Sequence, residues 1–251
     1  VLDAMGLEPW RSESAIRMSL GAATTQEEVS QACEGIKSIM PALKHACLRL
    51  SDLPGGGEGQ LNSGFIELFY NNCCCWLYID IEAKACIVID PLPQFSERIE
   101  KLISCQNLTV QAVIDTHLHA DHSPCHDSFS DFVLGNIAAD LRDTNDNGWP
   151  LHCDKTTTLA DGQTVPSLSV GALQVVAVET PGHSPDSISL LFIDQANTIV
   201  LALAGDLIMP GGLGRTDLAG GDTQACYHSL KKLAGLLTPD TLIGSSHDYQ
   251  H

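Results

Sequence analysis

The chain has 251 residues, of which 44% are hydrophobic and 18% are charged, a composition typical of folded proteins rather than of disordered ones. Thirteen Lys and Arg residues against 31 Asp and Glu residues give a formal net charge of −18, which argues against nucleic acid or an anionic membrane as a partner. The longest apolar runs, such as residues 199–204, have the length of a strand, whereas a membrane span needs about 20 residues.

Ten cysteines are present, but their spacing does not resemble that of a disulfide scaffold. Three are adjacent (residues 73–75) and the others are scattered, so we expect reduced thiols and a cytoplasmic location. The first residue is Val1 and not Met, and residues 1–10 lack the pattern of a signal peptide. We therefore expect a fragment of a longer protein, and the original targeting is left open.

Residues 1–50 are expected to form a small unit of their own. Residues 14–20 predict a short strand, and residues 24–27 (TTQE) form a capping box that predicts the start of a helix. Apolar residues then recur at helical spacing as far as Leu43. The Gly-rich residues 51–62 predict a linker, so we place the main domain at residues 63–251.

Strands and helices are mixed in the main domain. The expected strands cover residues 65–70, 74–81, 85–90, 110–115, 173–178, 188–193, 198–204 and 241–244. The expected helices cover residues 96–105, 129–141 and 223–237, the middle one with the weakest pattern. This alternation predicts an α/β layered fold.

A histidine-rich segment, THLHADH at residues 116–122, directly follows one predicted strand. His117 and His119 are two positions apart, so in extended backbone they point the same way and can bind one cation. Asp121 and His122 then turn toward a second position. Three histidines and a carboxylate so close together predict a metal site.

Three later strands each end near one further ligand-type side chain. His183 follows a Pro-Gly turn, Asp206 follows Gly205, and His247 follows the last predicted strand. Because the ends of strands in α/β sheets are where binding sites assemble, we expect these side chains to join the histidine-rich segment.

The order H-x-H-x-D-H, Gly-His, Gly-Asp and a final His resembles the metallo-β-lactamase superfamily over residues 63–251. The resemblance implies an αββα sandwich with metal at the edge of the sheets. It does not fix the activity, because that fold carries thioesterases, nucleases, lactamases and oxygenases.

Two further motifs, GRTD at residues 214–217 and HDY at residues 247–249, resemble the persulfide dioxygenase branch. That resemblance implies one Fe(II) per chain, a low-molecular-weight persulfide such as glutathione persulfide, and O₂ as substrates. The residues that it implies are metal ligands His117, His183 and Asp206; ligand- and water-orienting residues His119, Asp121, His122 and His247; and substrate-binding residues Arg215 and Tyr249. The chain departs from the family in having no cysteine beside GRTD.

Two other interpretations remain open at this point. In hydroxyacylglutathione hydrolases (glyoxalase II) the same side chains bind two zinc ions, and ligand spacing alone fits two zinc ions at least as well as one iron. Alternatively, the chain is a folded but inactive metal-binding fragment. A homodimer is kept as one option for the assembly.

Residues 1–7 and 14–21, with the capped helix after them, resemble the C-terminal end of a cysteine desulfurase. The resemblance implies a strand–helix remnant of an aminotransferase-type domain, with Arg17 at the position of the arginine that binds the substrate carboxylate. No pyridoxal phosphate is expected, since the cofactor lysine belongs to earlier parts of that family. An unrelated helical extension is the alternative.

Overall fold

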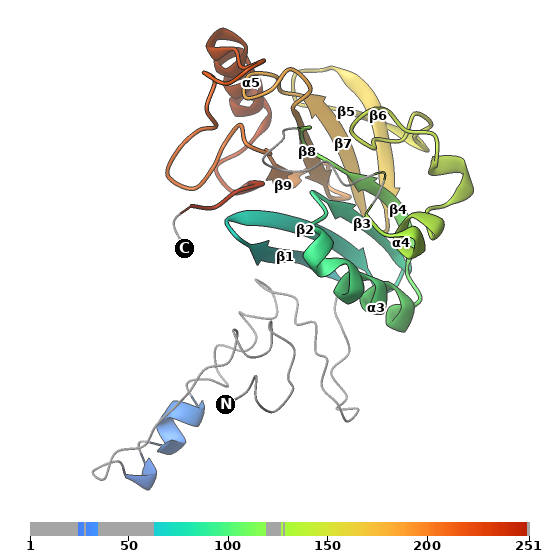
Figure 1. Cartoon of the computed structure of the whole chain (residues 1–251), viewed down its shortest axis with the longest axis vertical. Coiled ribbons are helices and arrows are strands. Elements are labelled where there is room, and N and C mark those ends of the chain that lie inside the picture. The colour runs from blue at the N-terminus through green and yellow to red at the C-terminus, as the bar shows by residue number, and fades with distance from the viewer. Residues whose placement is uncertain (1–24, 28, 35–62, 119–126, 128, 250–251) are drawn as a thin grey trace. The chain divides into compact units, whose positions relative to one another are not determined.

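The structure is a computed structural model that describes residues 25–27, 29–34, 63–118, 127 and 129–249 (Figure 1). The chain divides into two compact units, residues 1–43 and 44–251. In the first unit, residues 26–27 and 29–34 are helical, and the Val29 amide donates to the Thr25 carbonyl at 3.2 Å. The predicted strand at 14–20, the cap residue Thr24 and the linker at 51–62 lie outside the described residues, so the domain boundary stays a prediction.

The second unit contains two β-sheets. The first has the order β1-β2-β3-β4, in which only the β3–β4 pair is parallel. Its strands are β1 (Gly64–Tyr70), β2 (Cys73–Asp80), β3 (Ala85–Ile89) and β4 (Thr109–Ile114). The second sheet has the order β10-β9-β8-β7-β6-β5. Its strands are β5 (Lys155–Thr158), β6 (Thr164–Val170), β7 (Leu173–Glu179), β8 (Ile188–Ile193), β9 (Ile199–Leu203) and β10 (Leu242–Gly244).

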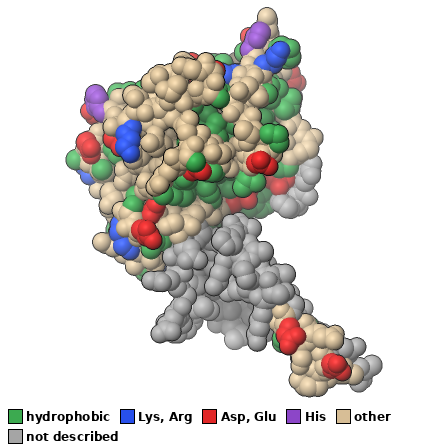
Figure 2. Space-filling view, turned by 180° about the vertical axis from the view of Figure 1, so that it is seen from behind, with side chains coloured by type: hydrophobic (Ala, Val, Ile, Leu, Met, Phe, Trp, Pro, Cys, Tyr) green, Lys and Arg blue, Asp and Glu red, His purple; other side chains and the backbone are tan. Residues whose placement is uncertain are grey.

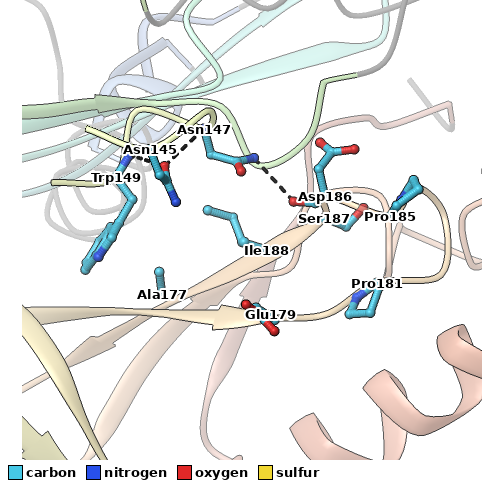
Figure 3. Close-up of a pocket in the computed structure, with 10 residues that line it drawn as sticks. All are labelled: Asn145, Asn147, Trp149, Ala177, Glu179, Pro181, Pro185, Asp186, Ser187 and Ile188. Carbon is cyan, nitrogen blue, oxygen red and sulfur yellow. Dashed lines mark hydrogen bonds between the residues drawn. The ribbon is translucent and has the colours of Figure 1, made fainter. Parts of the chain in front are cut away.

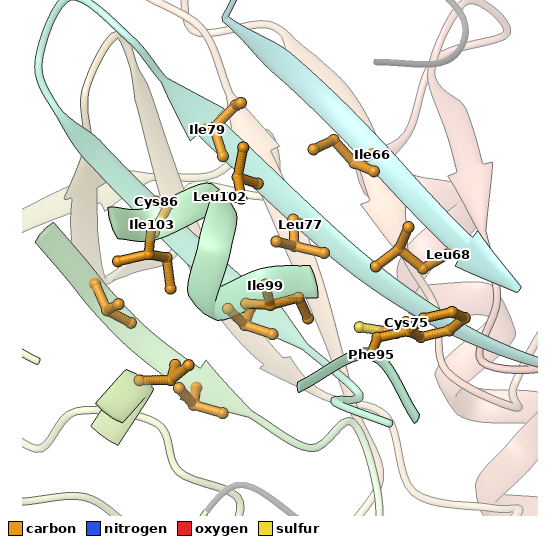
Figure 4. Close-up of a cluster of buried hydrophobic side chains, with 14 of the residues drawn as sticks. Ile66, Leu68, Cys75, Leu77, Ile79, Cys86, Phe95, Ile99, Leu102 and Ile103 are labelled. Atoms are coloured by element: carbon orange, nitrogen blue, oxygen red, sulfur yellow. The ribbon is translucent and has the colours of Figure 1, made fainter. Parts of the chain in front are cut away.

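Helices cover the outer faces of the two sheets. The buried face of α3 (Ser96–Gln106) presents Ile99, Leu102 and Ile103 to the first sheet, where they pack with Leu77 and its neighbours (Figure 4). Helix α5 (Thr223–Leu236) buries Leu233 and Leu236 against the second sheet. A third cluster, which includes Ile87, Ile114, Leu190 and Phe192, fills the space between the sheets. The layers are therefore α/β/β/α, as predicted.

Every strand expected in the main domain is present, and so are the helices at residues 96–105 and 223–237. The single helix expected at residues 129–141 is wrong. The chain instead forms α4 (Asp131–Gly135) and a 3₁₀ turn, Ala139–Leu141. Between them Ile137 pairs with Val110 of β4, and the Ala138 amide donates to the Val110 carbonyl at 3.3 Å. This pairing with the sheet replaces the hydrogen bonds that would have continued the helix.

Two strands, β5 and β6, were not expected. β5 is short, rich in threonine and at the edge of its sheet, and β6 contains Pro166, a residue that usually argues against a strand. The two strands form a local hairpin around Asp161-Gly162, where the Leu159 amide donates to the Gln163 carbonyl at 2.9 Å.

The described helices include none with the length and apolar content that a membrane crossing requires. On the face shown in Figure 2, the few Lys and Arg side chains lie apart from one another among Asp and Glu side chains. That face therefore offers no concentrated positive charge for a phosphate backbone.

Candidate metal centre

Three buried side chains from three different strand ends meet in one cluster. His117 follows β4, His183 follows β7 and Asp206 follows β9. Their relative exposures are 0%, 4% and 5%, respectively. One possible ligand atom of each residue lies within 4.8 Å of the others, so the three can hold one metal ion.

The distances between these atoms fit a shared metal ion. Asp206 Oδ2 lies 3.8 Å from His117 Nε2 and 3.5 Å from His183 Nε2, and the two imidazole rings meet edge to face at 5.2 Å. Ligand atoms at about 2.1 Å from a common metal are roughly 3.0–3.4 Å apart. A small contraction of the cluster would therefore bring all three atoms into bonding distance.

The second nitrogen of each imidazole ring is held by a neighbouring group. His183 Nδ1 donates to the Arg215 carbonyl at 2.8 Å, because a carbonyl oxygen can only accept. The Thr116 hydroxyl donates to Asp90 Oδ2 at 3.0 Å, so its oxygen accepts from His117 Nδ1 at 3.1 Å. With the proton on Nδ1 in both rings, each Nε2 presents its lone pair to the cluster.

The carboxylate of Asp90 anchors this side of the site. It accepts from the Thr116 amide at 2.6 Å and from the Ser246 hydroxyl at 2.5 Å, in addition to the Thr116 hydroxyl. Asp90 directly follows β3, Thr116 follows β4 and Ser246 follows β10, so one buried carboxylate ties three strand ends together. Neither Asp90 nor Ser246 is part of a motif that the sequence predicts, although the position of Asp90 at the end of an apolar strand is a usable signal.

His247 contacts the cluster through Asp206. Its Nδ1 donates to Asp206 Oδ1 at 2.7 Å, and its ring is 3% exposed. Burial by itself raises the pKa of the Asp206 carboxyl, but the His247 hydrogen bond and the nearby His117 and His183 rings outweigh it and lower the pKa overall. Asp206 is therefore a carboxylate at neutral pH, with Oδ1 bound to His247 and Oδ2 facing the other two imidazoles.

Two glycines permit this packing. A Cβ atom at Gly214 would lie 2.0 Å from the Asp206 carbonyl oxygen and 3.0 Å from His183 Nδ1. Gly205 has φ +56°, and a Cβ there would lie 3.0 Å from Thr116 Oγ1. Gly214 lets the chain approach closely enough for the next carbonyl, that of Arg215, to bind His183.

The two residues expected to bind substrate lie at the surface. The Arg215 guanidinium makes two hydrogen bonds of 2.9 Å to the Asp217 carboxylate, and both side chains are about 70% exposed. This pairing raises the pKa of Arg215 and lowers the pKa of Asp217. Tyr249 is 60% exposed, and its ring stacks on His247 with centroids 5.6 Å apart. The expected residues His119, Asp121 and His122 lie outside the described part of the chain.

Comparisons with known proteins agree with this architecture. The profile of the metallo-beta-lactamase superfamily matches residues 71–125. The persulfide dioxygenase ETHE1 of Bos taurus mitochondria is 26% identical over 211 residues, which cover 82% of this chain and 76% of the relative. A hydroxyacylglutathione hydrolase of Prochlorococcus marinus is 27% identical over 183 residues, which cover 71% of this chain and 66% of the relative.

A solved relative adds a structural comparison. The crystal structure of ETHE1 from Myxococcus xanthus has a TM-score of 0.57 and 25% identity, covering 74% of this chain and 76% of that one. The relatives named persulfide dioxygenase and hydroxyacylglutathione hydrolase are enzymes. The chain therefore has the metallo-β-lactamase fold, and residues 71–125 are similar to the profile of that superfamily.

Proposed function

We propose that the chain is an iron-dependent dioxygenase that oxidises a low-molecular-weight persulfide, with glutathione persulfide as the substrate. The balanced reaction is RSSH + O₂ + H₂O → RSH + HSO₃⁻ + H⁺, in which the terminal sulfur loses four electrons and O₂ gains them. The observation that carries the proposal is the buried cluster of His117, His183 and Asp206, taken together with relatives named persulfide dioxygenase.

The donor set favours iron. Two histidines and one carboxylate form the facial triad of non-haem Fe(II) oxygenases, which leaves three coordination positions open. Bound there, Fe(II) would supply adjacent open positions for the persulfide sulfur and for O₂. The chain's own residues hold the triad in shape: the Arg215 carbonyl and Thr116 orient the two imidazoles, and His247 orients Asp206.

The remaining residues have proposed roles of smaller effect. We assign Arg215 to attracting the anionic substrate. For this role its guanidinium must release the Asp217 carboxylate and bind the substrate instead. The Arg215–Asp217 ion pair is weak because both side chains are exposed. Tyr249 would contribute its hydroxyl beside the metal, since its ring already stacks on His247. His119, Asp121 and His122 would orient ligands and water.

A dizinc glutathione thioesterase is the second candidate, favoured by the H-x-H-x-D-H spacing and by the hydroxyacylglutathione hydrolase relative. In that enzyme class a metal-bound hydroxide attacks the thioester. A second metal on Asp206 and His247 would have to replace their 2.7 Å hydrogen bond, and this bond supports the one-metal proposal.

Two further proposals concern the chain as a whole. We propose a cytoplasmic location, because the spacing of the ten cysteines does not resemble that of a disulfide scaffold. Residues 1–50 remain our proposed remnant of a cysteine desulfurase, a family that makes persulfide, and this proposal rests on resemblance alone.

The two enzyme candidates differ in the product that they form from glutathione derivatives. Fe(II)-loaded protein should produce sulfite from glutathione persulfide and should release no thiol from S-lactoylglutathione. Zinc-loaded protein is the control, and it should do neither. Thiol release from the thioester, without sulfite from the persulfide, would overturn the proposal in favour of the thioesterase.

A further inference from the structure

One loop, residues 184–188, holds the backbone on both sides of His117. The Leu118 amide donates to Asp186 Oδ2 at 2.6 Å. The Ile188 amide donates to the Thr116 carbonyl at 2.9 Å. These two peptide groups flank the Cα atom of His117, so the loop fixes both backbone dihedrals of this histidine.

The same loop directly follows His183, the second histidine of the cluster. It is held in shape by its own hydrogen bonds: the Ser184 and Ser187 hydroxyls are 2.7 Å apart, and the Thr180 amide donates to the Ser187 carbonyl at 2.9 Å. A loop that is fixed internally and carries one imidazole therefore also sets the backbone of the other imidazole.

Asn147 reinforces this connection from the side. Its side-chain Nδ2 donates to the Asp115 backbone carbonyl at 3.1 Å and to the Asp186 backbone carbonyl at 3.3 Å. The backbone carbonyl of Asn147 accepts from the Asp115 amide at 2.9 Å. Figure 3 shows Asn147 and Asp186 at the wall of a cavity of about 290 Å³, with the dashed bond between them. The Asp186 side chain extends away from Ile188 in this view, and its carboxylate binds the chain that follows β4.

We propose that Asp186 is a positioning residue for the metal centre. Its carboxylate, by holding the Leu118 amide, aims His117 Nε2 at the point shared by His183 Nε2 and Asp206 Oδ2. The bond from the Leu118 amide to this carboxylate is short, at 2.6 Å, and half-buried. The inference rests on the metal site of the proposed function and is independent of the reaction performed there.

Co(II) titration of the metal-free protein, followed by visible absorption, tests the proposal. Asp186→Ala should bind Co(II) roughly 10- to 100-fold more weakly, as is typical when a group that orients a metal ligand is lost. Asp186→Asn keeps an acceptor oxygen at the same place and should recover most of the affinity. Asp186→Leu, which fills the space without an acceptor, should repeat the loss and provides the measurement if the alanine variant does not fold.

The matched control is Asp154→Ala, which also removes one carboxylate–amide hydrogen bond, that of the Ser169 amide at 2.8 Å. It should lower the melting temperature of the metal-free protein by a smaller amount, because this bond is exposed, and leave Co(II) affinity unchanged. Wild-type affinity in Asp186→Ala and Asp186→Leu, or equal losses in Asp186→Asn and Asp186→Ala, would overturn the proposal. No Co(II) binding by the unaltered chain would refute the metal site itself, and this inference with it.

Discussion

Replacing Thr116 by valine tests the network that orients His117. Valine keeps the shape of threonine but lacks the hydroxyl, which contacts Asp90 Oδ2 at 3.0 Å, His117 Nδ1 at 3.1 Å and Ser246 Oγ at 2.9 Å. Thr116 is only 1% exposed, so water does not replace these contacts. The substitution leaves His117 Nδ1 without its acceptor and removes one of the donors to a buried carboxylate.

The expected loss of stability follows from the two main contacts. A hydrogen bond to an ionised carboxylate contributes about 1.5–3 kcal/mol and a neutral one about 0.5–1.5 kcal/mol, so the loss is about 2–4.5 kcal/mol. Metal affinity should fall roughly tenfold, since the imidazole ring loses the partner that sets its tautomer and orientation. Thr157→Val is the matched control: Thr157 is 7% exposed and bonds Ser167 and Gln174, both uncharged.

Urea unfolding of the metal-free proteins gives the stability difference, and Co(II) titration gives the affinity. The control variant should lose stability while binding Co(II) as the unaltered chain does. If Thr116→Val binds Co(II) within a factor of two of the unaltered chain, the proposed role of this network in orienting His117 is refuted.

Elemental analysis of anaerobically purified protein should find close to one iron per chain. The iron should be lost in Asp206→Ala and largely kept in His122→Ala. Two zinc ions per chain, one of which is lost in His122→Ala, would contradict the one-metal account. Gly214→Ala should remove the metal, because the added Cβ atom would collide with the Asp206 carbonyl. Arg215→Ala should keep the metal, and steady-state kinetics should show kcat/KM lowered roughly tenfold. Burial raises the pKa of the Cys86 thiol from 9.0 to about 12 in the folded chain. Above pH 9 the thiol therefore ionises in the unfolded chain but not in the folded one, and the free energy of unfolding decreases. At pH 10 this loss is about 1.4 kcal/mol, and urea unfolding of Cys86→Ala under reducing conditions should lack it.

The fold was predictable because its strands are apolar and are separated by clear turns. Residues 85–89 are an uninterrupted apolar run and residues 188–193 are apolar except for Ser189, and both become strands buried on both faces. The helix expected at residues 129–141 failed because the pairing of Ile137 with Val110 depends on a strand distant in sequence. β5 and β6 were missed for a different reason: they pair locally through the turn at Asp161-Gly162, but β5 is rich in threonine and β6 contains Pro166.

The convergence of His117, His183 and Asp206 was predictable because each follows an apolar strand. The groups that orient them were harder to foresee. The resemblance of GRTD implies a substrate-binding side chain at Arg215, yet it is the Arg215 carbonyl that binds His183. Asp186 lies on a turn with no motif of its own, and its bond to Leu118 joins positions 68 residues apart. Local spacing predicts candidate ligands, but it does not predict the side chains that would orient them.

Oxygen consumption tests the central claim most directly. Protein loaded anaerobically with Fe(II) is mixed with glutathione persulfide in air-saturated buffer, and dissolved O₂ and sulfite are measured together. The account predicts persulfide-dependent uptake with about one sulfite formed per O₂, and no enzymatic uptake in Asp206→Ala. Loss of persulfide or release of thiol without O₂ uptake, in protein shown to contain iron, would contradict it.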